Sequence, residues 1–123
     1  MTKVFNVLAA SFIAVFAVAG LTGCTTQEPL DMSQYAAVID VRTPEETSLG
    51  YLEGAQLFDI QNSSFMGNLA TLDPAADYYI YCRSGNRAGQ AIETMKQAGF
   101  TGELVNGGSL ENAANQTGLT VVQ

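Results

Sequence analysis

The hydrophobic positions of this chain fall into two regions with different patterns. Val7 to Leu21 form an apolar run that only Ser11 interrupts, whereas short apolar segments alternate with polar ones from Glu28 onward. A run of about 15 apolar residues is typical of a signal segment and is shorter than the roughly 20 residues that span a bilayer. The pattern therefore predicts a processed leader followed by a globular body.

Five segments of the body combine β-branched, aromatic and other apolar residues over a few positions, as strands do. They cover residues 37–41, 55–60, 78–81, 103–106 and 119–122. Helix signals lie between most of these segments, and such alternation is typical of parallel sheets. We therefore predict a single α/β domain with a mainly parallel central sheet of about five strands, flanked by helices.

Four stretches carry the helix signals. Thr43-Pro44-Glu45-Glu46 supplies an N-cap, a proline at the first helical position and a glutamate at the third, which form a capping box. Residues 63–72 are predicted as a short helix or loop, and residues 110–115 as a short helix. Residues 88–95 repeat apolar side chains at helical spacing, which predicts an amphipathic helix that ends near Gly99.

The body is strongly acidic. Residues 24–123 carry twelve Asp and Glu against four Lys and Arg, so the net charge is −8 once Lys3 is removed, against −7 for the whole chain. Nucleic-acid binding needs clustered cations, and we exclude it. The chain has no His, which excludes hydrolases with a histidine base and His-ligated zinc. We predict neither a metal nor a dissociable cofactor.

The leader ends in a cysteine. Leu21-Thr22-Gly23-Cys24 follows the apolar run and resembles the lipobox of bacterial lipoproteins. The resemblance implies cleavage of residues 1–23, lipidation of Cys24, a polar tether over residues 24–34 and a domain over residues 35–123. The domain would then face the periplasm or the exterior from a membrane anchor in the cell envelope. An uncleaved anchor is the alternative. Thr25 after Cys24 is a weak signal for the outer membrane in enteric-type bacteria, and the sequence does not decide between the inner and the outer membrane.

Cys82 is then the only thiol of the mature chain. Cys82-Arg83-Ser84-Gly85-Asn86-Arg87 lies between a predicted strand and the amphipathic helix. A helix N-terminus, two guanidinium groups and main-chain amides that glycine allows to curl inward all favour the thiolate. A buried, inert cysteine is the alternative, and the two cations beside the thiol argue against it.

This hexapeptide resembles the active-site loop of rhodanese-like sulfurtransferases. Similar segments are residues 39–46, residues 50–55 and Asn106-Gly107-Gly108, so the resemblance spans residues 37 to about 112. It is strongest to the small periplasmic rhodaneses of the phage-shock type. The resemblance implies transfer of sulfane sulfur from thiosulfate to cyanide or a thiol acceptor, through a covalent persulfide and without a cofactor.

The resemblance also implies roles for single residues. Cys82 is the expected nucleophile, and the expected substrate-binding residues are Arg83, Ser84, Gly85, Asn86 and Arg87. The guanidinium groups of Arg83 and Arg87 would meet the sulfonate of thiosulfate. Asp40 and Arg42 are expected near the floor of the site, where we interpret them as a structural ion pair.

Two other functions are weighed against this one. A non-catalytic rhodanese module would bind a partner or sense redox state through Cys82. Phosphatases and arsenate reductases of similar fold use a loop one residue longer, so the loop from Cys82 to Arg87 favours sulfur over a tetrahedral oxyanion. The physiological donor and acceptor and the oligomeric state are not predicted.

Overall fold

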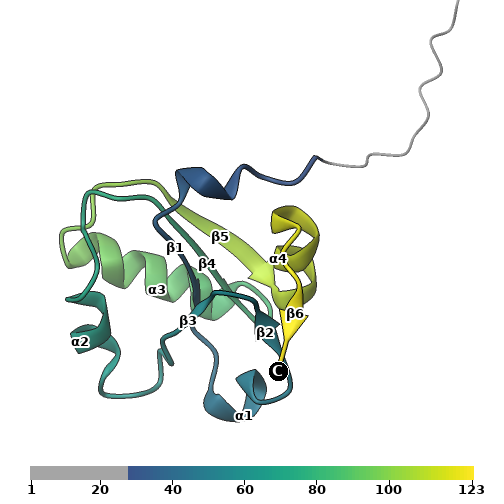
Figure 1. Cartoon of the computed structure of the whole chain (residues 1–123). Helices are drawn as coiled ribbons and strands as arrows, with labels where there is room; N and C mark the ends of the chain where they lie inside the picture. Colours follow the sequence, from purple (N-terminus) through teal and green to yellow (C-terminus); the bar gives the residue numbers. More distant parts are fainter. Residues whose placement is uncertain (1–27) are drawn as a thin grey trace, which may run out of the picture.

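A parallel sheet forms the centre of the molecule (Figure 1). The computed structural model describes residues 28–123, so the predicted leader and Cys24 lie outside the described residues. The sheet contains four strands in the order β3-β1-β4-β5: β3 (Gln56–Leu57), β1 (Ala37–Asp40), β4 (Tyr78–Cys82) and β5 (Leu104–Ser109). The predicted α/β fold with a mainly parallel sheet is confirmed.

The sheet is one strand smaller than the sequence predicts. The last predicted strand is reduced to β6 (Val121–Val122), which pairs antiparallel with β2 (Tyr51–Leu52) apart from the central sheet. Gly118 caps the preceding helix with a φ of 70°, a left-handed conformation that glycine adopts readily. The chain turns back there, and the few residues left meet β2 instead of an edge of the sheet.

Helices cover both faces of the sheet. They are α1 (Pro44–Thr47), α2 (Phe65–Leu69), α3 (Asn86–Gln97) and α4 (Leu110–Thr117). One hydrophobic cluster joins α2 and α3 to one sheet face, and a second cluster joins α4 and β2 to the other. Figure 1 shows α2 and α3 on one side of the sheet and α4 with β6 on the other. The predicted amphipathic helix is α3, whose buried positions are Ala88, Ala91, Ile92 and Met95.

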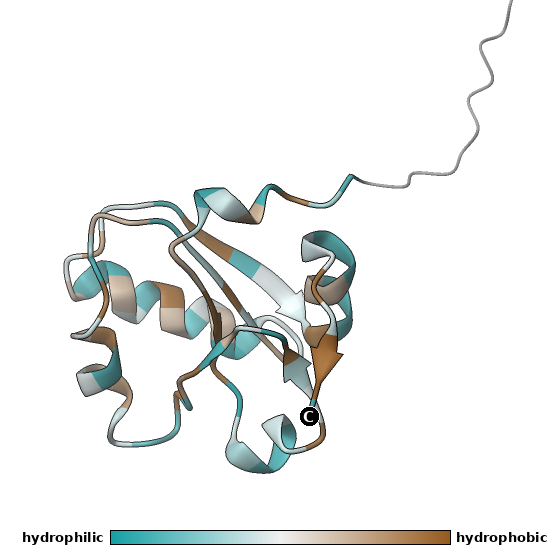
Figure 2. Ribbon diagram, in the orientation of Figure 1, coloured by the Kyte–Doolittle hydropathy of each residue, from teal (hydrophilic) through white to brown (hydrophobic). Residues whose placement is uncertain are grey.

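Strand β4 lies between these two cores, and all of its residues are buried. Successive side chains of a strand point to opposite faces. Ile80 and Cys82 belong to the cluster under α3, whereas Tyr79 and Tyr81 belong to the cluster under α4. The hydropathy colouring of Figure 2 shows β1 mainly brown, β5 brown at its start and paler toward its end, and mixed colours on the helices. The alternation aims Cys82 toward α3.

The last residues of the predicted tether belong to the domain. The N–H of Leu30 donates to the carbonyl of Gln116 at 2.8 Å. A 3-10 turn follows over Met32–Gln34, and Met32 and Tyr35 pack against the cluster under α4. The domain therefore includes the residues from Leu30 onward, because apolar side chains of this stretch pack on its surface.

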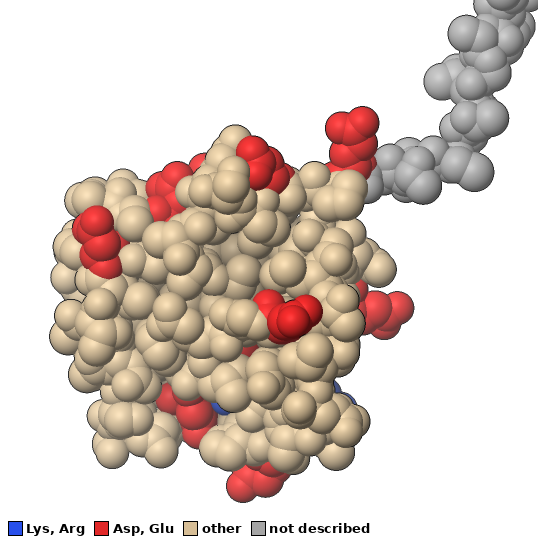
Figure 3. All heavy atoms as spheres, in the orientation of Figure 1, with Lys and Arg blue, Asp and Glu red and all other residues tan. Residues whose placement is uncertain are grey.

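Most charged side chains on the face drawn in Figure 3 are acidic. Figure 3 shows Asp and Glu side chains spread over one face, with only small areas of Lys or Arg in view. Within residues 28–123, no helix combines the length and the apolar character that a membrane crossing needs.

Candidate active site

Cys82 lies at the carboxyl end of β4, where ligands of parallel sheets bind. Its side chain is fully buried, with 0% exposure, because it points into the core under α3. The chain then forms the Cys82 loop, residues 82–87, and enters α3 at Asn86. The fold therefore brings the thiol to the N-terminus of the longest helix of the described residues, as the sequence predicts.

Gly85 connects the loop to the sulfur. Its N–H donates to the Cys82 Sγ at 2.9 Å. Gly85 caps α3 with a φ of 94°, a left-handed conformation that costs residues with a Cβ about 1–2 kcal/mol. A Cβ at this position would also lie 3.3 Å from the Gly108 Cα. Only glycine therefore fits here without strain, and the curl that it permits points an amide at the sulfur.

Arg87 is held by a carboxylate instead of facing an open site. Its two terminal nitrogens bind the two carboxylate oxygens of Glu46 at 2.7 Å each. This hydrogen bonding to Arg87 is the main reason that the pKa of Glu46 falls to about 2, and Glu46 in turn raises the pKa of Arg87. The resemblance implies that Arg87 binds substrate, and in the structure Arg87 pairs with Glu46 of α1.

Glu46 also closes the capping box of α1. Its Oε2 accepts from the N–H of Thr43 at 3.0 Å and from the Thr43 hydroxyl at 3.1 Å. The predicted capping box is confirmed. One carboxylate therefore starts α1 and anchors the first turn of α3, which lies 41 residues further along the chain. The sequence shows the first of these roles and gives no sign of the second.

Asp40 and Arg42 form a buried ion pair at the end of β1, with side-chain exposures of 0% and 7%. The Arg42 Nη2 lies 2.7 Å from the Asp40 Oδ2 and donates to the Gly50 carbonyl at 2.6 Å. Burial by itself lowers the pKa of Arg42, but the hydrogen bonds and charge of Asp40 outweigh it and raise that pKa. The pair holds the turn at Gly50, which agrees with the structural interpretation.

A hollow of about 360 Å³ opens beside the Cys82 loop. It is lined by Arg42, Glu46, Leu49, Gly50, Arg83 and Leu110. Arg42 and Glu46 are already paired, whereas Arg83 makes no ion pair with any residue from 28 to 123. Arg83 is exposed and follows Cys82 directly, so it is the arginine of this hollow that can receive an anion.

The remaining loop residues are placed at the surface. Ser84 and Asn86 are exposed, and Asn86 is the first residue of α3. The side chain of Asn106 reaches this loop from β5, where its Nδ2 donates to the Gly85 carbonyl at 2.9 Å. The sequence marks Asn106 only as part of Asn106-Gly107-Gly108, since the pairing of β5 with β4 cannot be read from local residues.

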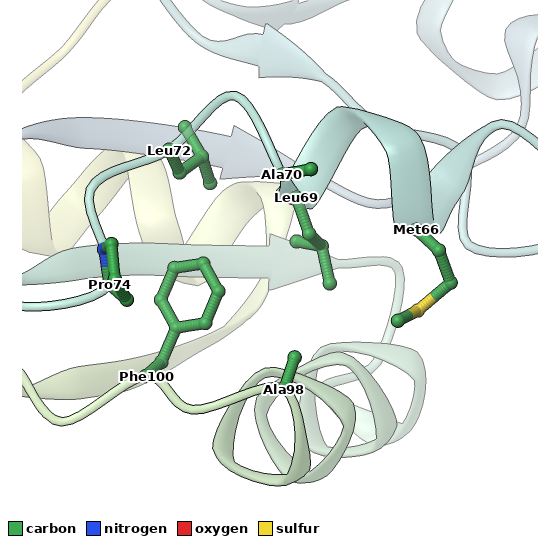
Figure 4. A pocket seen from close by; sticks show the side chains of 7 residues that line it. All are labelled: Met66, Leu69, Ala70, Leu72, Pro74, Ala98 and Phe100. Carbon is green, nitrogen blue, oxygen red and sulfur yellow. The ribbon is translucent and has the colours of Figure 1, made fainter.

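A second hollow, of about 260 Å³, lies between α2 and the end of α3 (Figure 4). It is lined by Met66, Leu69, Ala70, Leu72, Pro74, Ala98 and Phe100. None of these side chains is ionisable or nucleophilic, so this hollow offers no chemistry. Nor do residues 28–123 contain any group of three or more His, Cys, Asp or Glu side chains placed to hold a metal ion.

Comparison with known proteins points to one family. The model of the rhodanese-like domain matches residues 25–115. The thiosulfate sulfurtransferase PspE of Escherichia coli is 30% identical over 76 residues, which cover 62% of this chain and 72% of that protein. The probable adenylyltransferase/sulfurtransferase MoeZ of Mycobacterium tuberculosis is 35% identical over 58% of this chain, and the match covers only 18% of MoeZ.

Solved structures agree with this result. A rhodanese-like domain protein of Staphylococcus aureus is 30% identical, with a TM-score of 0.57 over 71% of this chain and 81% of that one. A rhodanese of E. coli, solved with anions, is 26% identical, with a TM-score of 0.58 over 71% of this chain and 96% of that one. The sheet and the helices described above are therefore shared with experimentally determined rhodanese domains.

Proposed function

Given that this chain belongs to the rhodanese-like family, we propose that it is a thiosulfate sulfurtransferase acting through Cys82. Sulfurtransferases among its relatives support the reaction class. The observation that carries the proposal is a hydrogen bond at the N-terminus of α3, which the Gly85 N–H donates to the Cys82 Sγ. Arg83 adds a cation with no carboxylate partner in the described domain.

The reaction proceeds in two covalent steps. The Cys82 thiolate attacks the outer sulfur of thiosulfate, the sulfur–sulfur bond of thiosulfate breaks, and sulfite leaves with the electron pair. The product on the enzyme is a Cys82 persulfide anion. Cyanide or a thiolate acceptor then attacks the terminal sulfur, and the Cys82 thiolate leaves as the electron pair returns to it. The thiol proton is lost to solvent before the first step.

The residues around Cys82 have different roles in these two steps. The anionic sulfonate of thiosulfate meets Arg83 in the hollow beside the loop, while Arg87 stays with Glu46. The N–H of Gly85 stabilises negative charge on sulfur, and the positive end of the α3 dipole, at the helix N-terminus, adds to this effect. Because Cys82 is fully buried, the Cys82 loop must open for the attack. No histidine is needed, since no hydroxyl is deprotonated.

The mass of the intact protein tests the proposal. Exposure to thiosulfate should add one sulfur atom, about 32 Da, that cyanide or a thiol removes. A Cys82→Ser variant, folded by circular dichroism, should gain nothing. A wild-type protein that gains no mass, or a variant that gains as much as the wild type, would show that Cys82 does not carry a persulfide.

A non-catalytic module is the second candidate, and the complete burial of Cys82 favours it. In that case the loop keeps the thiol inaccessible to substrates, and the hollow only binds a partner. A folded wild-type protein that neither gains sulfur nor reacts with iodoacetamide would support this candidate over the enzyme.

We further propose that the domain is a lipoprotein of the cell envelope. The proposal rests on Leu21-Thr22-Gly23-Cys24 after the apolar run. The Leu30 N–H is bonded to the domain and Met32 packs on it, which leaves a short polar stretch after Cys24 as the link to the membrane.

A further inference from the structure

The side chain of Asn106 is bonded at both of its ends. Its Nδ2 donates to the Gly85 carbonyl at 2.9 Å, and its Oδ1 accepts from the N–H of Gly108 at 2.9 Å. Gly85 belongs to the Cys82 loop, whereas Gly108 belongs to β5. Asn106 therefore ties the loop that follows β4 to the neighbouring strand.

Burial does not explain these two bonds. Asn106 is exposed, so water could satisfy both its amide nitrogen and its oxygen. An exposed side chain that is fixed in one rotamer also loses conformational entropy. The two bonds hold it in place nonetheless, and the group that they fix is the Gly85 carbonyl.

Gly85 needs such a support because it has no conformational preference of its own. Glycine populates positive and negative φ about equally, so its φ of 94° has to be imposed by contacts. The N–H of Gly85 donates to the Cys82 Sγ, and its carbonyl accepts from the N–H of Gly89 at 2.9 Å as well as from Asn106. The bond to Asn106 links it to a strand outside its own helix.

We infer that Asn106 is a positioning residue of the sulfurtransferase, an inference that rests on the proposed function. By holding the Gly85 carbonyl it fixes the turn that aims the Gly85 N–H at the sulfur. Asn106 acts through Gly85, whereas Arg83 binds the donor. Loss of the Asn106 bond should therefore slow sulfur transfer at saturating thiosulfate and leave the half-saturating concentration unchanged.

Two substitutions and one matched control test this role. Asn106→Ala removes both bonds, and Asn106→Asp keeps an acceptor for the Gly108 N–H but removes the donor to Gly85. Asn112→Ala is the control, because the Asn112 Nδ2 donates to the Gly107 carbonyl at 2.7 Å and so joins β5 to α4 without contacting the Cys82 loop. The measurements are persulfide formation in a single turnover with thiosulfate, and amide hydrogen exchange in residues 83–87.

Both Asn106 variants should form the persulfide roughly tenfold more slowly at saturation, with a half-saturating concentration within about twofold of wild type. Exchange in residues 83–87 should rise roughly tenfold, and Asn112→Ala should change neither quantity. A wild-type rate in Asn106→Asp, or an equal loss in Asn112→Ala, would overturn the inference.

The experiment also separates a failure of the proposed function from a failure of the role of Asn106. If the wild type forms no persulfide, the exchange data still decide whether Asn106 holds the loop. Faster exchange in Asn106→Ala alone would keep Asn106 as the residue that orders the loop, and unchanged exchange would remove that role.

Discussion

The two arginines of the Cys82 loop have different partners although they lie four positions apart. Arg87 points to α1 and binds Glu46 through both terminal nitrogens, whereas Arg83 is exposed and lines the hollow. The positive charge of a guanidinium in a bidentate pair is largely balanced by its carboxylate, which weakens its attraction for an anionic substrate. We therefore propose that Arg83 binds the donor and that Arg87 supports the loop.

Replacement of Arg83 tests this division at the residue scale. Arg83→Ala should raise the KM for thiosulfate roughly tenfold, because one charge-assisted contact contributes about 1.5–3 kcal/mol. The maximal rate should change little. Lys96→Ala is the matched control, because Lys96 is a cation in the last turn of α3, at the end away from the loop. Steady-state kinetics at several thiosulfate concentrations provide both values, and an unchanged KM in Arg83→Ala would contradict the assignment.

At the scale of elements, the Glu46–Arg87 pair joins a helix of four residues to one of twelve. Helix α1 is too short to be stable by its own hydrogen bonds, and its capping box and this ion pair hold it in place. The pair also fixes the first turn of α3, on which the Cys82 loop ends. Support for the loop thus comes from α1 on one side and from β5, through Asn106, on the other.

Glu46→Gln should lower the free energy of unfolding at pH 7 by about 1–2 kcal/mol, which allows for solvent screening of a partly exposed pair. The folded state lowers the pKa of Glu46 from 4.5 to about 2. The stabilisation is therefore complete above pH 4.5 and is lost as the pH falls toward 2.

Urea unfolding at several pH values would measure this difference. The difference in the free energy of unfolding between wild type and Glu46→Gln should become smaller below pH 4.5. Glu45→Gln is the control, because Glu45 is an exposed neighbour in the same helix and has no ion pair among the described residues. If this difference in unfolding free energy stays constant with pH, the ion pair does not cause it.

At the scale of the whole molecule, charge and hydrophobicity are separated along the chain. The only apolar run long enough to associate with lipid lies before Cys24, and all twelve acidic residues lie after it. A body with a net charge near −8 is repelled by anionic lipid surfaces. The domain itself therefore offers no electrostatic attachment to such surfaces, and on the proposal above acyl chains on Cys24 hold it at the membrane.

Membrane fractionation tests the anchor. The mature protein should stay in the membrane fraction at high salt and be released by detergent, because acyl chains bind by the hydrophobic effect. Mass spectrometry should find a lipidated Cys24 at the terminus, and Cys24→Ser should abolish this lipidation. Release of the wild type by salt alone, or an intact Met1 terminus, would rule out the lipidated form.

Local patterns in the sequence were enough to predict the fold class and the strand and helices around Cys82. The aromatic strand that leads into Cys82, the amphipathic spacing of α3 and the capping box at Thr43 are all present in the structure. These features depend on residues within a few positions of each other. Strand alternation and helix periodicity are therefore visible without knowledge of the fold.

Only the tertiary structure decided which side chains meet. The order β3-β1-β4-β5 places the ends of β1 and β5 on either side of Cys82, which brings Glu46 to Arg87 and Asn106 to Gly85. It also pairs β6 with β2 instead of adding a fifth strand to the sheet. These contacts join residues from 21 to 71 positions apart. Their partners are selected by strand order and by packing of the two cores, and no local pattern of side chains encodes that choice.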